Sequence, residues 1–321
     1  MTRPKVLVTQ RLFPEALERL KEKTEVEGGV AEVPLSKEEF MAKVADKEGL
    51  LSFLVNRVDR EIIDQAKKLK IIANCAVGYD NIDVAYCRQK GILVTNTPGV
   101  LTETTADLTW ALILAVARKI PQADRFLKEG GRFCGWVLDF FLGQEVHGQR
   151  LGIIGMGRIG QAVARRAAGF NMEIVYYDPH PLPKEEELKL GATYLPLDDL
   201  LQTADIVTIH ASLNPSTYHL LSREKIALMK PSAILINVAR GPIVDEKALA
   251  EALLQGKIWG AGLDVYEREP EVEASLLVAE NVVLLPHIGS ATKSTRLQMA
   301  LTAVRNLLQG LAGQKPDNLV W

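Results

Sequence analysis

Four polar residues stand directly after apolar segments in the second half of the chain. They are His210, Arg240, Asp264 and His287, and each follows a run, such as residues 282–285, that predicts a buried β-strand. The carboxyl ends of parallel strands meet at one edge of a sheet, where open α/β folds bind their ligands. Although any one of these residues alone is more often structural, their joint occurrence predicts a catalytic site at this edge.

The chemistry of these side chains indicates the handling of protons and carboxylates. His287 can exchange a proton near neutral pH, and Arg240 can bind a carboxylate through two parallel hydrogen bonds. A carboxylate beside His287 would hold its ring and favour its charged form. Glu269 is the first candidate for that carboxylate and Glu267 the second. With a hydride from a nicotinamide cofactor, this set would reduce a 2-keto acid to a 2-hydroxy acid.

A glycine-rich segment near the middle of the chain predicts the cofactor. Residues 151–160, Leu-Gly-Ile-Ile-Gly-Met-Gly-Arg-Ile-Gly, read as a strand, a tight turn and the start of a helix. In this pattern Gly155 permits the turn, Gly157 lets a pyrophosphate approach the backbone, and Gly160 lets helix and strand pack closely. The pyrophosphate would lie at the helix N-terminus, where free N–H groups and the helix dipole favour anions.

Asp178 predicts which dinucleotide binds. It follows a second strand, Glu173–Tyr177, about 20 residues after the glycines, where an acidic residue accepts a hydrogen bond from the ribose 2′-hydroxyl. An aspartate would repel the 2′-phosphate of NADP, and Lys184, the nearest cation in sequence, is poorly placed to offset this. We therefore expect NAD as the cofactor, with NADH preferred over NADPH.

Strands alternate with helices along the chain, which predicts an α/β fold with two doubly wound parallel-sheet domains. Residues 1–100 form the first part of a substrate domain. A long helix from about 102 to 119, continuing toward 128, opens the dinucleotide-binding domain, 101–287. The remaining segment, 288–321, holds one amphipathic helix, which is too little for a domain and is expected to return to the first. A Rossmann domain would thus be inserted into a split flavodoxin-like substrate domain, with the ligand between them.

Composition excludes several other classes of protein. The 321 residues are 47% hydrophobic and 24% charged, with a net charge of −2 and no basic block, so neither nucleic acid nor a membrane surface is an expected partner. The longest apolar stretch, residues 108–117, is too short to span a bilayer. The three cysteines, Cys75, Cys87 and Cys134, have no metal or redox spacing, so we expect no metal site and a cytoplasmic location.

The motifs together resemble the D-2-hydroxyacid dehydrogenase family along essentially the full chain. The matching segments are Asn74–Asp83, Thr95–Pro98, Thr105–Leu108, Gly155–Gly160, Asn237–Gly241, Gly262–Tyr266, Glu269–Pro270 and Pro286–Ser290. Gly135-Trp136 and Phe141-Leu-Gly143 make the chain most similar to the glyoxylate/hydroxypyruvate reductase branch. Both domains and the split layout agree with this resemblance.

The resemblance implies roles for individual residues. The family's catalytic trio corresponds to Arg240, Glu269 and His287. The backbone N–H groups of Val77 and Gly78 would bind the substrate carboxylate beside Arg240, and Leu54 would line the pocket. Trp136 would reach the site of a partner subunit, because the family forms homodimers through the nucleotide domain.

Cofactor contacts are predicted from the motifs and the resemblance together. The residues concerned are Thr105, Gly155, Gly157, Arg158, Ile159, Gly160, Asp178, His210, Ala239, Asp264, His287 and Gly289. Thr105 would contact the phosphates, whereas Ala239 and Asp264 would contact the nicotinamide carboxamide. For Asp264 this contact is favoured over a structural cap, while for His210 both roles stay open, because the run 210–213 lacks the proline-containing turn of many family members.

Other activities share much of this pattern. The leading expectation is NAD(H)-dependent reduction of glyoxylate, hydroxypyruvate or a similar small 2-keto acid to the D-2-hydroxy acid. D-3-Phosphoglycerate dehydrogenase is less favoured because no extra regulatory domain is evident, and phosphite dehydrogenase stays an alternative. Formate dehydrogenases carry glutamine at the position of Glu269 and are disfavoured. A non-enzymatic alternative is an NADH-sensing binding protein of the corepressor type, which would bind the cofactor with little turnover.

Overall fold

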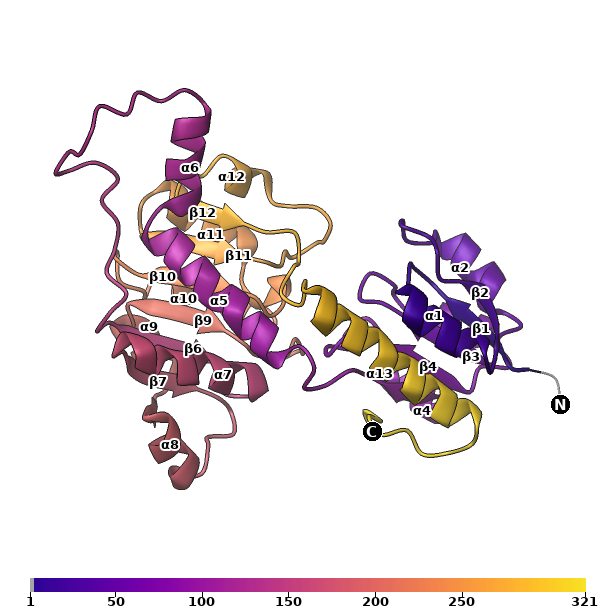
Figure 1. Ribbon diagram of the computed structural model, residues 1–321. Coiled ribbons are helices and arrows are strands. Elements are labelled where there is room, and N and C mark those ends of the chain that lie inside the picture. The colour runs from indigo at the N-terminus through magenta and orange to yellow at the C-terminus, as the bar shows by residue number, and fades with distance from the viewer. Residues whose placement is uncertain (1–2) are drawn as a thin grey trace. The chain divides into compact units, whose positions relative to one another are not determined.

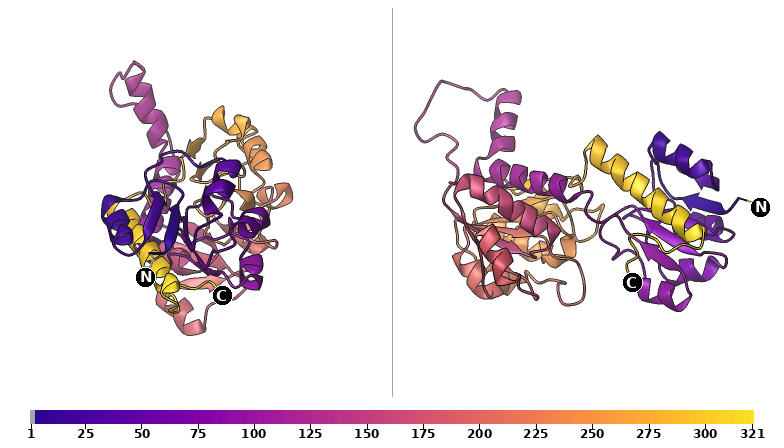
Figure 2. Two further views of the ribbon diagram at one scale, coloured as in Figure 1. Left: turned by 90° about the vertical axis from the view of Figure 1, so that its right-hand side faces the viewer. Right: turned by 60° about the horizontal axis from the view of Figure 1, so that its bottom comes forward.

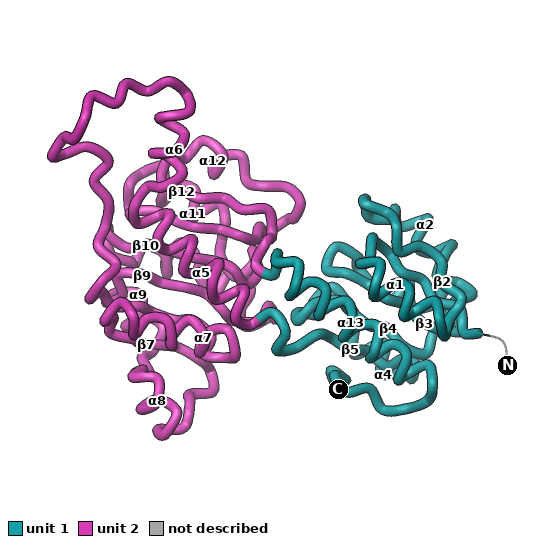
Figure 3. The backbone as a smooth tube through the Cα atoms, viewed as in Figure 1, with its two compact units in different colours: residues 1–101, 290–321 teal, residues 102–289 magenta. Residues whose placement is uncertain are grey.

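The computed structural model describes residues 3–321, which divide into two compact units (Figure 3). Unit 1 contains the N-terminal segment up to Leu101 together with Ser290–Trp321, and unit 2 contains Thr102–Gly289. The predicted borders, 100/101 and 287/288, lie one and two residues before these boundaries. Each unit is built on a parallel sheet, so the predicted fold class, with two doubly wound α/β domains, is confirmed.

Unit 1 holds a five-stranded sheet in the order β2-β1-β3-β4-β5. Its strands are β1 (Lys5–Val8), β2 (Glu25–Gly28), β3 (Gly49–Ser52), β4 (Ile71–Asn74) and β5 (Leu93–Thr95). Its helices are α1 (Pro14–Lys21), α2 (Lys37–Val44), α3 (Arg60–Gln65), α4 (Val84–Gln89) and α13 (Lys293–Leu311). This strand order is the flavodoxin-like one.

Helices cover both faces of the sheet of unit 1 (Figure 1). Successive residues of a strand point to opposite faces, so Val6 and Val8 of β1 pack under α1 and α13. Leu7 faces the opposite side, where α2, α3 and α4 contribute Phe40, Ile62 and other apolar side chains. The helix near the C-terminus therefore completes the core begun by the first hundred residues.

Unit 2 holds seven strands in the order β12-β11-β10-β9-β6-β7-β8. The strands are β6 (Arg150–Ile154), β7 (Glu173–Tyr177), β8 (Ala192–Tyr194), β9 (Ile206–Ile209), β10 (Ile234–Asn237), β11 (Gly260–Leu263) and β12 (Val282–Leu284). Counted from β6, this is the Rossmann order 3-2-1-4-5-6 with a seventh strand added at the edge. The direction of winding reverses between β6 and β9, which is where such sheets bind dinucleotides.

Helices also cover both faces of the sheet of unit 2. The helices are α5 (Thr102–Ala117), α6 (Ile120–Lys128), α7 (Arg158–Ala167), α8 (Lys184–Leu190), α9 (Leu197–Thr203), α10 (Arg223–Ile226), α11 (Glu246–Leu254) and α12 (Ala274–Leu277), with short 3-10 turns η1 (Ala168–Phe170) and η2 (Gly241–Ile243). Helices α5 and α7 pack over Ile153 and Ile236 on one face. Helices α9, α10 and α11 pack over Ile154 and Leu235 on the other (Figure 1).

Side chains at the helix starts explain where several helices begin. Ser36 accepts the backbone N–H of Glu39 and the Glu39 carboxylate accepts the N–H of Ser36, which forms a capping box before α2. Asp245 accepts the N–H of Ala248 at the start of α11, and Thr292 accepts that of Thr295 at the start of α13.

The long helix predicted from about 102 to 119 is present as α5, Thr102–Ala117, but its continuation to 128 as one helix is wrong. The structure divides it into α5 and α6 at Lys119, which adopts a left-handed φ of 51°. Pro121 explains the break, because its ring would clash with the carbonyl of Ala117 in a continuous helix. That carbonyl instead accepts the backbone N–H of Gln144 at 2.8 Å.

The coil after α6 leaves the body of unit 2 before the chain returns to β6 (Figures 1 and 2). Strands β2 and β8 and helix α8 are short, and the sequences of β2 and α8 are largely polar, so an apolar pattern does not mark these elements in the sequence. Within residues 3–321, no helix is both long enough and apolar enough to cross a membrane.

Candidate active site

The glycine-rich turn lies at the switch point between β6 and β9. Gly155 has a φ of 92°, and a Cβ built on it would lie 2.6 Å from the backbone nitrogen of Ala211. A Cβ on Gly160 would lie 2.2 Å from the carbonyl oxygen of Gly155. Around Gly157, by contrast, a Cβ would meet no atom within 4 Å. Two glycines are thus required by the fold, while the third borders open space at the N-terminus of α7, which fits a bound pyrophosphate.

Asp178 lies directly against this turn. Its carboxylate accepts the backbone N–H of Met156 through Oδ2 and that of His180 through Oδ1, each at 2.9 Å. Asp178, which is predicted to bind the ribose, therefore contacts the loop that is predicted to bind the phosphates. Lys184, the cation considered above, forms a salt bridge with Glu187 at 2.5 Å instead. The neighbouring residues Arg158 and Ile159 open α7 at the same turn.

His287 and Glu269 form a hydrogen-bonded pair at the carboxyl edge of the sheet. Nδ1 of His287 lies 2.8 Å from Oε2 of Glu269, and their side chains are 31% and 34% exposed. Partial burial would raise the pKa of Glu269, but the hydrogen bond and the positive charges of His287 and Arg240 lower it overall. The carboxylate is therefore ionised and can only accept, so Nδ1 carries a proton and Nε2 is left for exchange with a substrate.

Arg240 follows β10 on a loop that a buried asparagine holds. Asn237 accepts the N–H of Ala239 at 3.0 Å and donates to the carbonyl of Arg240 at 2.9 Å. The guanidinium group is close enough to lower the pKa of Glu269. A Cβ on the next residue, Gly241, would lie 1.9 Å from the carbonyl carbon of Tyr266, so the two loops touch through their backbones. Arg240, Glu269 and His287 are thus brought together within unit 2.

Asp264 lies beneath the segment that carries His287. It is completely buried and accepts the N–H groups of Ile288 and Gly289, both at 2.7 Å. Burial raises the pKa of Asp264, although these two donors act in the opposite direction. Thr105, predicted to contact phosphates, donates its hydroxyl to the carbonyl of Gly289 at 3.3 Å. The contacts of Asp264 are those of the structural cap that the sequence left as the second choice.

The remaining histidine and glutamate candidates, His210 and Glu267, have hydrogen-bond partners outside the His287–Glu269 pair. Glu267, the second candidate for the partner of His287, instead lies 3.1 Å from Nε2 of His219. Nε2 of His210 lies 3.0 Å from the hydroxyl of Thr208, and its buried Nδ1 has no hydrogen-bond partner among residues 3–321. Burial lowers the pKa of His210 to about 3, so its ring is neutral at physiological pH.

The predicted substrate contacts of unit 1 lie at the carboxyl edge of its own sheet. Leu54 follows β3, and Val77 and Gly78 follow β4. The carbonyl of Val77 accepts the side-chain amide of Asn96 at 2.8 Å, and the carbonyl of Gly78 accepts that of Asn74 at 2.9 Å. The bond to the Val77 carbonyl fixes the peptide unit that carries the Gly78 N–H. The unit that carries the Val77 N–H is fixed through the Ala76 carbonyl, which accepts the backbone N–H of Thr97 at 2.8 Å.

The sequence profile of the D-isomer specific 2-hydroxyacid dehydrogenases, NAD binding domain, matches residues 110–289. The chain belongs to this family. The match covers more than half of the chain and contains the glycine-rich turn and the cluster of Arg240, Glu269 and His287. The predicted family resemblance is thereby confirmed.

Relatives and solved structures match this chain along nearly its whole length. A glyoxylate reductase from Thermococcus kodakarensis is 48% identical over 321 residues, covering 99% of this chain and 96% of that protein. The crystal structure of the TT0316 protein from Thermus thermophilus has a TM-score of 0.90 and 46% identity, covering 99% and 100% of the two chains. An NADPH-dependent glyoxylate/hydroxypyruvate reductase from Sinorhizobium meliloti, solved with NADP and malonate, has a TM-score of 0.87 and 35% identity, covering 99% and 97%.

Some residues that hold the site were not singled out from the sequence. Asn237 clamps the loop of Arg240, and Tyr266 donates its hydroxyl to the carbonyl of Leu285 at 2.9 Å, next to the segment of His287. The sequence signal for Asn237 was its position as a polar residue at the end of an apolar strand. No local signal marks Tyr266, because its partner lies on another strand.

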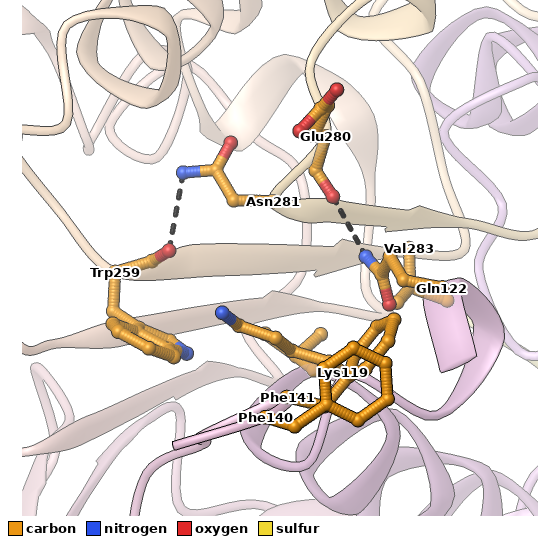
Figure 4. Close-up of a pocket in the computed structure, with 9 residues that line it drawn as sticks. Lys119, Gln122, Phe140, Phe141, Trp259, Glu280, Asn281 and Val283 are labelled. Carbon is orange, nitrogen blue, oxygen red and sulfur yellow. Dashed lines mark hydrogen bonds between the residues drawn. The ribbon is translucent and has the colours of Figure 1, made fainter. Parts of the chain in front are cut away.

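A pocket of unit 2 lies at the other edge of the sheet. It has a volume of about 470 Å³ and lies beside Trp259 and Asn281, which precede β11 and β12 (Figure 4). Phe140 and Phe141 lie side by side in it, next to Lys119. The catalytic candidates follow their strands, so this pocket is separate from them. Within the described residues, no group of three or more histidine, cysteine, aspartate or glutamate side chains could hold a metal ion.

Proposed function

We propose that this protein reduces glyoxylate, hydroxypyruvate or a similar small 2-keto acid to the D-2-hydroxy acid, with NADH as the reductant. The observation that carries the proposal is the His287–Glu269 pair with Arg240 beside it, at the carboxyl edge of a Rossmann sheet. The glyoxylate reductases among its relatives support the substrate class. Phosphoglycerate and phosphite remain the alternative substrates within the family.

The residues of the chain have separable roles in this reaction. When bound, the nicotinamide supplies a hydride to the carbonyl carbon of the keto acid. Arg240 binds the substrate carboxylate and polarises the carbonyl, since its guanidinium charge is permanent. His287 gives the proton on Nε2 to the carbonyl oxygen, and Glu269 stabilises the charged ring before that transfer. Each turnover consumes one hydride and one proton, and His287 recovers its proton from solvent.

We further propose that the substrate carboxylate is also held by the backbone N–H groups of Val77 and Gly78, with Leu54 lining the pocket. The hydrogen bonds that hold the carbonyls of Ala76 and Val77, which share peptide units with these two N–H groups, support this role. Thr105 would contact the cofactor phosphates, and Ala239 and Asp264 would contact the nicotinamide carboxamide. Gly289 is a further proposed cofactor contact. In this proposal Asp264 acts mainly through the backbone that it holds.

The preference for NADH over NADPH rests on Asp178. Its carboxylate would accept the ribose 2′-hydroxyl and repel a 2′-phosphate. The salt bridge between Lys184 and Glu187 supports this preference, because the lysine is already neutralised. The Sinorhizobium meliloti relative is described as NADPH-dependent, so cofactor choice varies among similar proteins and has to be measured.

We also propose a homodimer formed through the nucleotide domain. Helix α6, from which the segment between α6 and β6 departs, is anchored where Gln122 donates to the carbonyl of Glu280 at 2.7 Å (Figure 4). The middle of that segment carries exposed apolar side chains, with Trp136 84% and Leu138 77% exposed. Several exposed apolar side chains on one segment indicate a protein interface, and a second copy would cover them. Light scattering after gel filtration measures the mass and tests this; a monomer at micromolar concentration would exclude a stable dimer.

The deciding experiment is steady-state oxidation of NADH with glyoxylate, hydroxypyruvate, pyruvate, 2-ketoglutarate and phosphohydroxypyruvate, repeated with NADPH, and with phosphite and NAD⁺. The highest kcat/KM is expected with glyoxylate or hydroxypyruvate and NADH. Turnover only with phosphite or a larger acid would overturn the substrate class. Tight NADH binding without any turnover would favour the NADH-sensing protein. The cytoplasmic location stays a prediction from cysteine content.

A further inference from the structure

A buried carboxylate outside the catalytic cluster has an unusual set of partners. Glu246 is the first residue of α11 and is only 6% exposed. Its Oε2 accepts the backbone N–H of Glu267 at 2.6 Å, and its Oε1 accepts that of Glu273 at 2.8 Å. Its own N–H points to Oε2 of Glu267 at 3.4 Å. Both oxygens of this side chain are therefore used to hold backbone, and the positive end of α11 favours their charge.

The two N–H groups that Glu246 accepts lie on either side of Glu269. The segment 265–273 connects β11 with α12 and has no regular secondary structure of its own. Within it, Oε1 of Glu269 accepts the N–H of Tyr266 at 3.1 Å, while Oε2 faces His287. Anchoring the segment before and after Glu269 fixes where that carboxylate meets the histidine ring.

Glu246 also lies five residues after the start of η2, which directly follows Arg240. The chain passes from Arg240 through η2 into α11 with the backbone of Gly241 pressed against Tyr266. One carboxylate thus ties the segment that carries Glu269 to the segment that carries Arg240.

We propose that Glu246 is a positioning residue, which sets the distance between Glu269 and His287 by holding the 265–273 segment at two points. This inference rests on the proposed function in one respect, which is that Glu269 and His287 are the catalytic pair. A carboxylate is required because both acceptors are in use. Glutamine keeps one acceptor and places an amide donor against the second backbone N–H, so Glu246→Gln breaks one of the two anchors.

The test compares Glu246→Gln with Glu251→Gln, which removes an exposed carboxylate of the same helix that pairs with Arg223. For Glu246→Gln, kcat with glyoxylate is expected to fall roughly 10- to 100-fold, as for a misplaced catalytic group. The dissociation constant of NADH should stay within about twofold, because the cofactor turn is untouched. The decline of kcat/KM with rising pH should begin at lower pH, since the ring loses its ordered carboxylate. The Glu251→Gln variant should match the wild type.

A second pair of variants covers the case in which Glu246→Gln does not fold. Glu273 has a φ of −56°, which proline can adopt. Glu273→Pro removes both the N–H that Oε1 accepts and the side chain that caps the N–H of Ser275, while Glu273→Ala removes that cap but keeps the N–H. The proline variant should reproduce the shifted pH profile and the alanine variant should not. Equal pH profiles in the proline and alanine variants would show a purely structural role and overturn the proposal. The same conclusion would follow if Glu246→Gln lost activity only in proportion to its lower Tm and kept the pH profile of the wild type.

An independent readout separates this inference from the proposed function. The NMR signals of the His287 ring can be titrated in the protein without substrate, so the measurement does not require turnover. A ring titration that moves to lower pH in Glu246→Gln supports the positioning role even if no keto acid is reduced. An unmoved titration contradicts it, whatever the activity of the wild type.

Discussion

Asp264 and Gly289 are joined by a hydrogen bond of 2.7 Å, in which the Gly289 N–H donates to a completely buried carboxylate. The other carboxylate oxygen accepts the N–H of Ile288. His287, which directly precedes Ile288 and Gly289, has a φ of 53°, a left-handed conformation that non-glycine residues rarely adopt. Such a conformation costs about 1–3 kcal/mol and persists where its surroundings fix it. Asp264 therefore determines the backbone from which the histidine ring reaches Glu269.

Replacing His287 by alanine should remove the proton donor and leave the dinucleotide turn intact. We expect kcat/KM for glyoxylate to fall by about 10²–10⁴-fold, the range of a lost general acid. The affinity for NADH, followed by its fluorescence, should change little. His147→Ala is the matched control, because that histidine is exposed and is hydrogen-bonded to Asn171. A His287→Ala enzyme with near-normal kcat/KM would exclude this residue as the proton donor.

Replacing Arg240 by lysine tests whether a planar, two-pronged cation is needed. A lysine keeps the charge but cannot form two parallel hydrogen bonds with a carboxylate. We expect KM to rise and kcat to fall, with a combined loss in kcat/KM of roughly 10²-fold or more. Arg223→Lys, on the surface of α10, should have no such effect. Unchanged kinetics in Arg240→Lys would mean that a point charge suffices and that bidentate binding is not used.

Replacing Glu269 by glutamine should change the pH dependence more than the fold. The pKa of Glu269 is lowered by its contact with His287, so the carboxylate is ionised at neutral pH. Glutamine removes that charge, and the charged ring becomes less favourable. The decline of kcat/KM for keto-acid reduction with rising pH should therefore begin at lower pH than in the wild type. Identical pH profiles would remove Glu269 from proton handling.

The sequence predicted the parts of the site that depend on local pattern. A strand, a glycine turn and a helix lie within one short segment, so the turn at Gly155 and the place of Asp178 beside it could be anticipated. Arg240 and His287 follow strong apolar strands, which place both residues at one edge of a parallel sheet. The break at Lys119 was also readable in principle, since Pro121 forbids a continuous helix.

The supporting contacts could not be predicted in the same way. Glu246, Tyr266 and Asp264 act on backbone groups that are distant in sequence, and their partners become visible only once strands are ordered in a sheet. Asp264 shows the difficulty clearly. Its position at a strand end was recognised, but whether its oxygens faced a cofactor or the backbone of Ile288 depended on the next strand along the sheet.

Replacing Asp178 should change the choice between the two dinucleotides. Asp178→Ala removes the acceptor for the 2′-hydroxyl and the charge that repels a 2′-phosphate, so the ratio of kcat/KM with NADPH to that with NADH should rise. A tenfold rise would correspond to about 1.4 kcal/mol. Because Asp178 also accepts the N–H of Met156, the stability of the variant is measured in parallel. Asp198→Ala, an exposed aspartate at the start of α9, is the control. An unchanged ratio would show that Asp178 does not set the preference.

His210 should make the stability of the cofactor-free protein depend on pH. Burial lowers the pKa of His210 to about 3 from its ordinary value of 6.5, so the folded protein keeps the ring neutral while the unfolded chain takes up a proton below pH 6.5. Stability from this group is therefore complete above pH 6.5 and is lost as the pH falls toward 3, by at most about 1.4 kcal/mol per pH unit.

The measurement is urea unfolding of the wild type and of His210→Gln at several pH values between 4 and 8. In His210→Gln, no group at this position gains a proton on unfolding, so the stability of the variant should fall less steeply below pH 6.5 than that of the wild type. Its stability at pH 8 can be lower, because the bond to Thr208 is altered. His180→Gln serves as the control, since that histidine is exposed and should not change the slope. Parallel curves for the wild type and His210→Gln would mean that the ring of His210 takes up a proton in the folded state as easily as in the unfolded one.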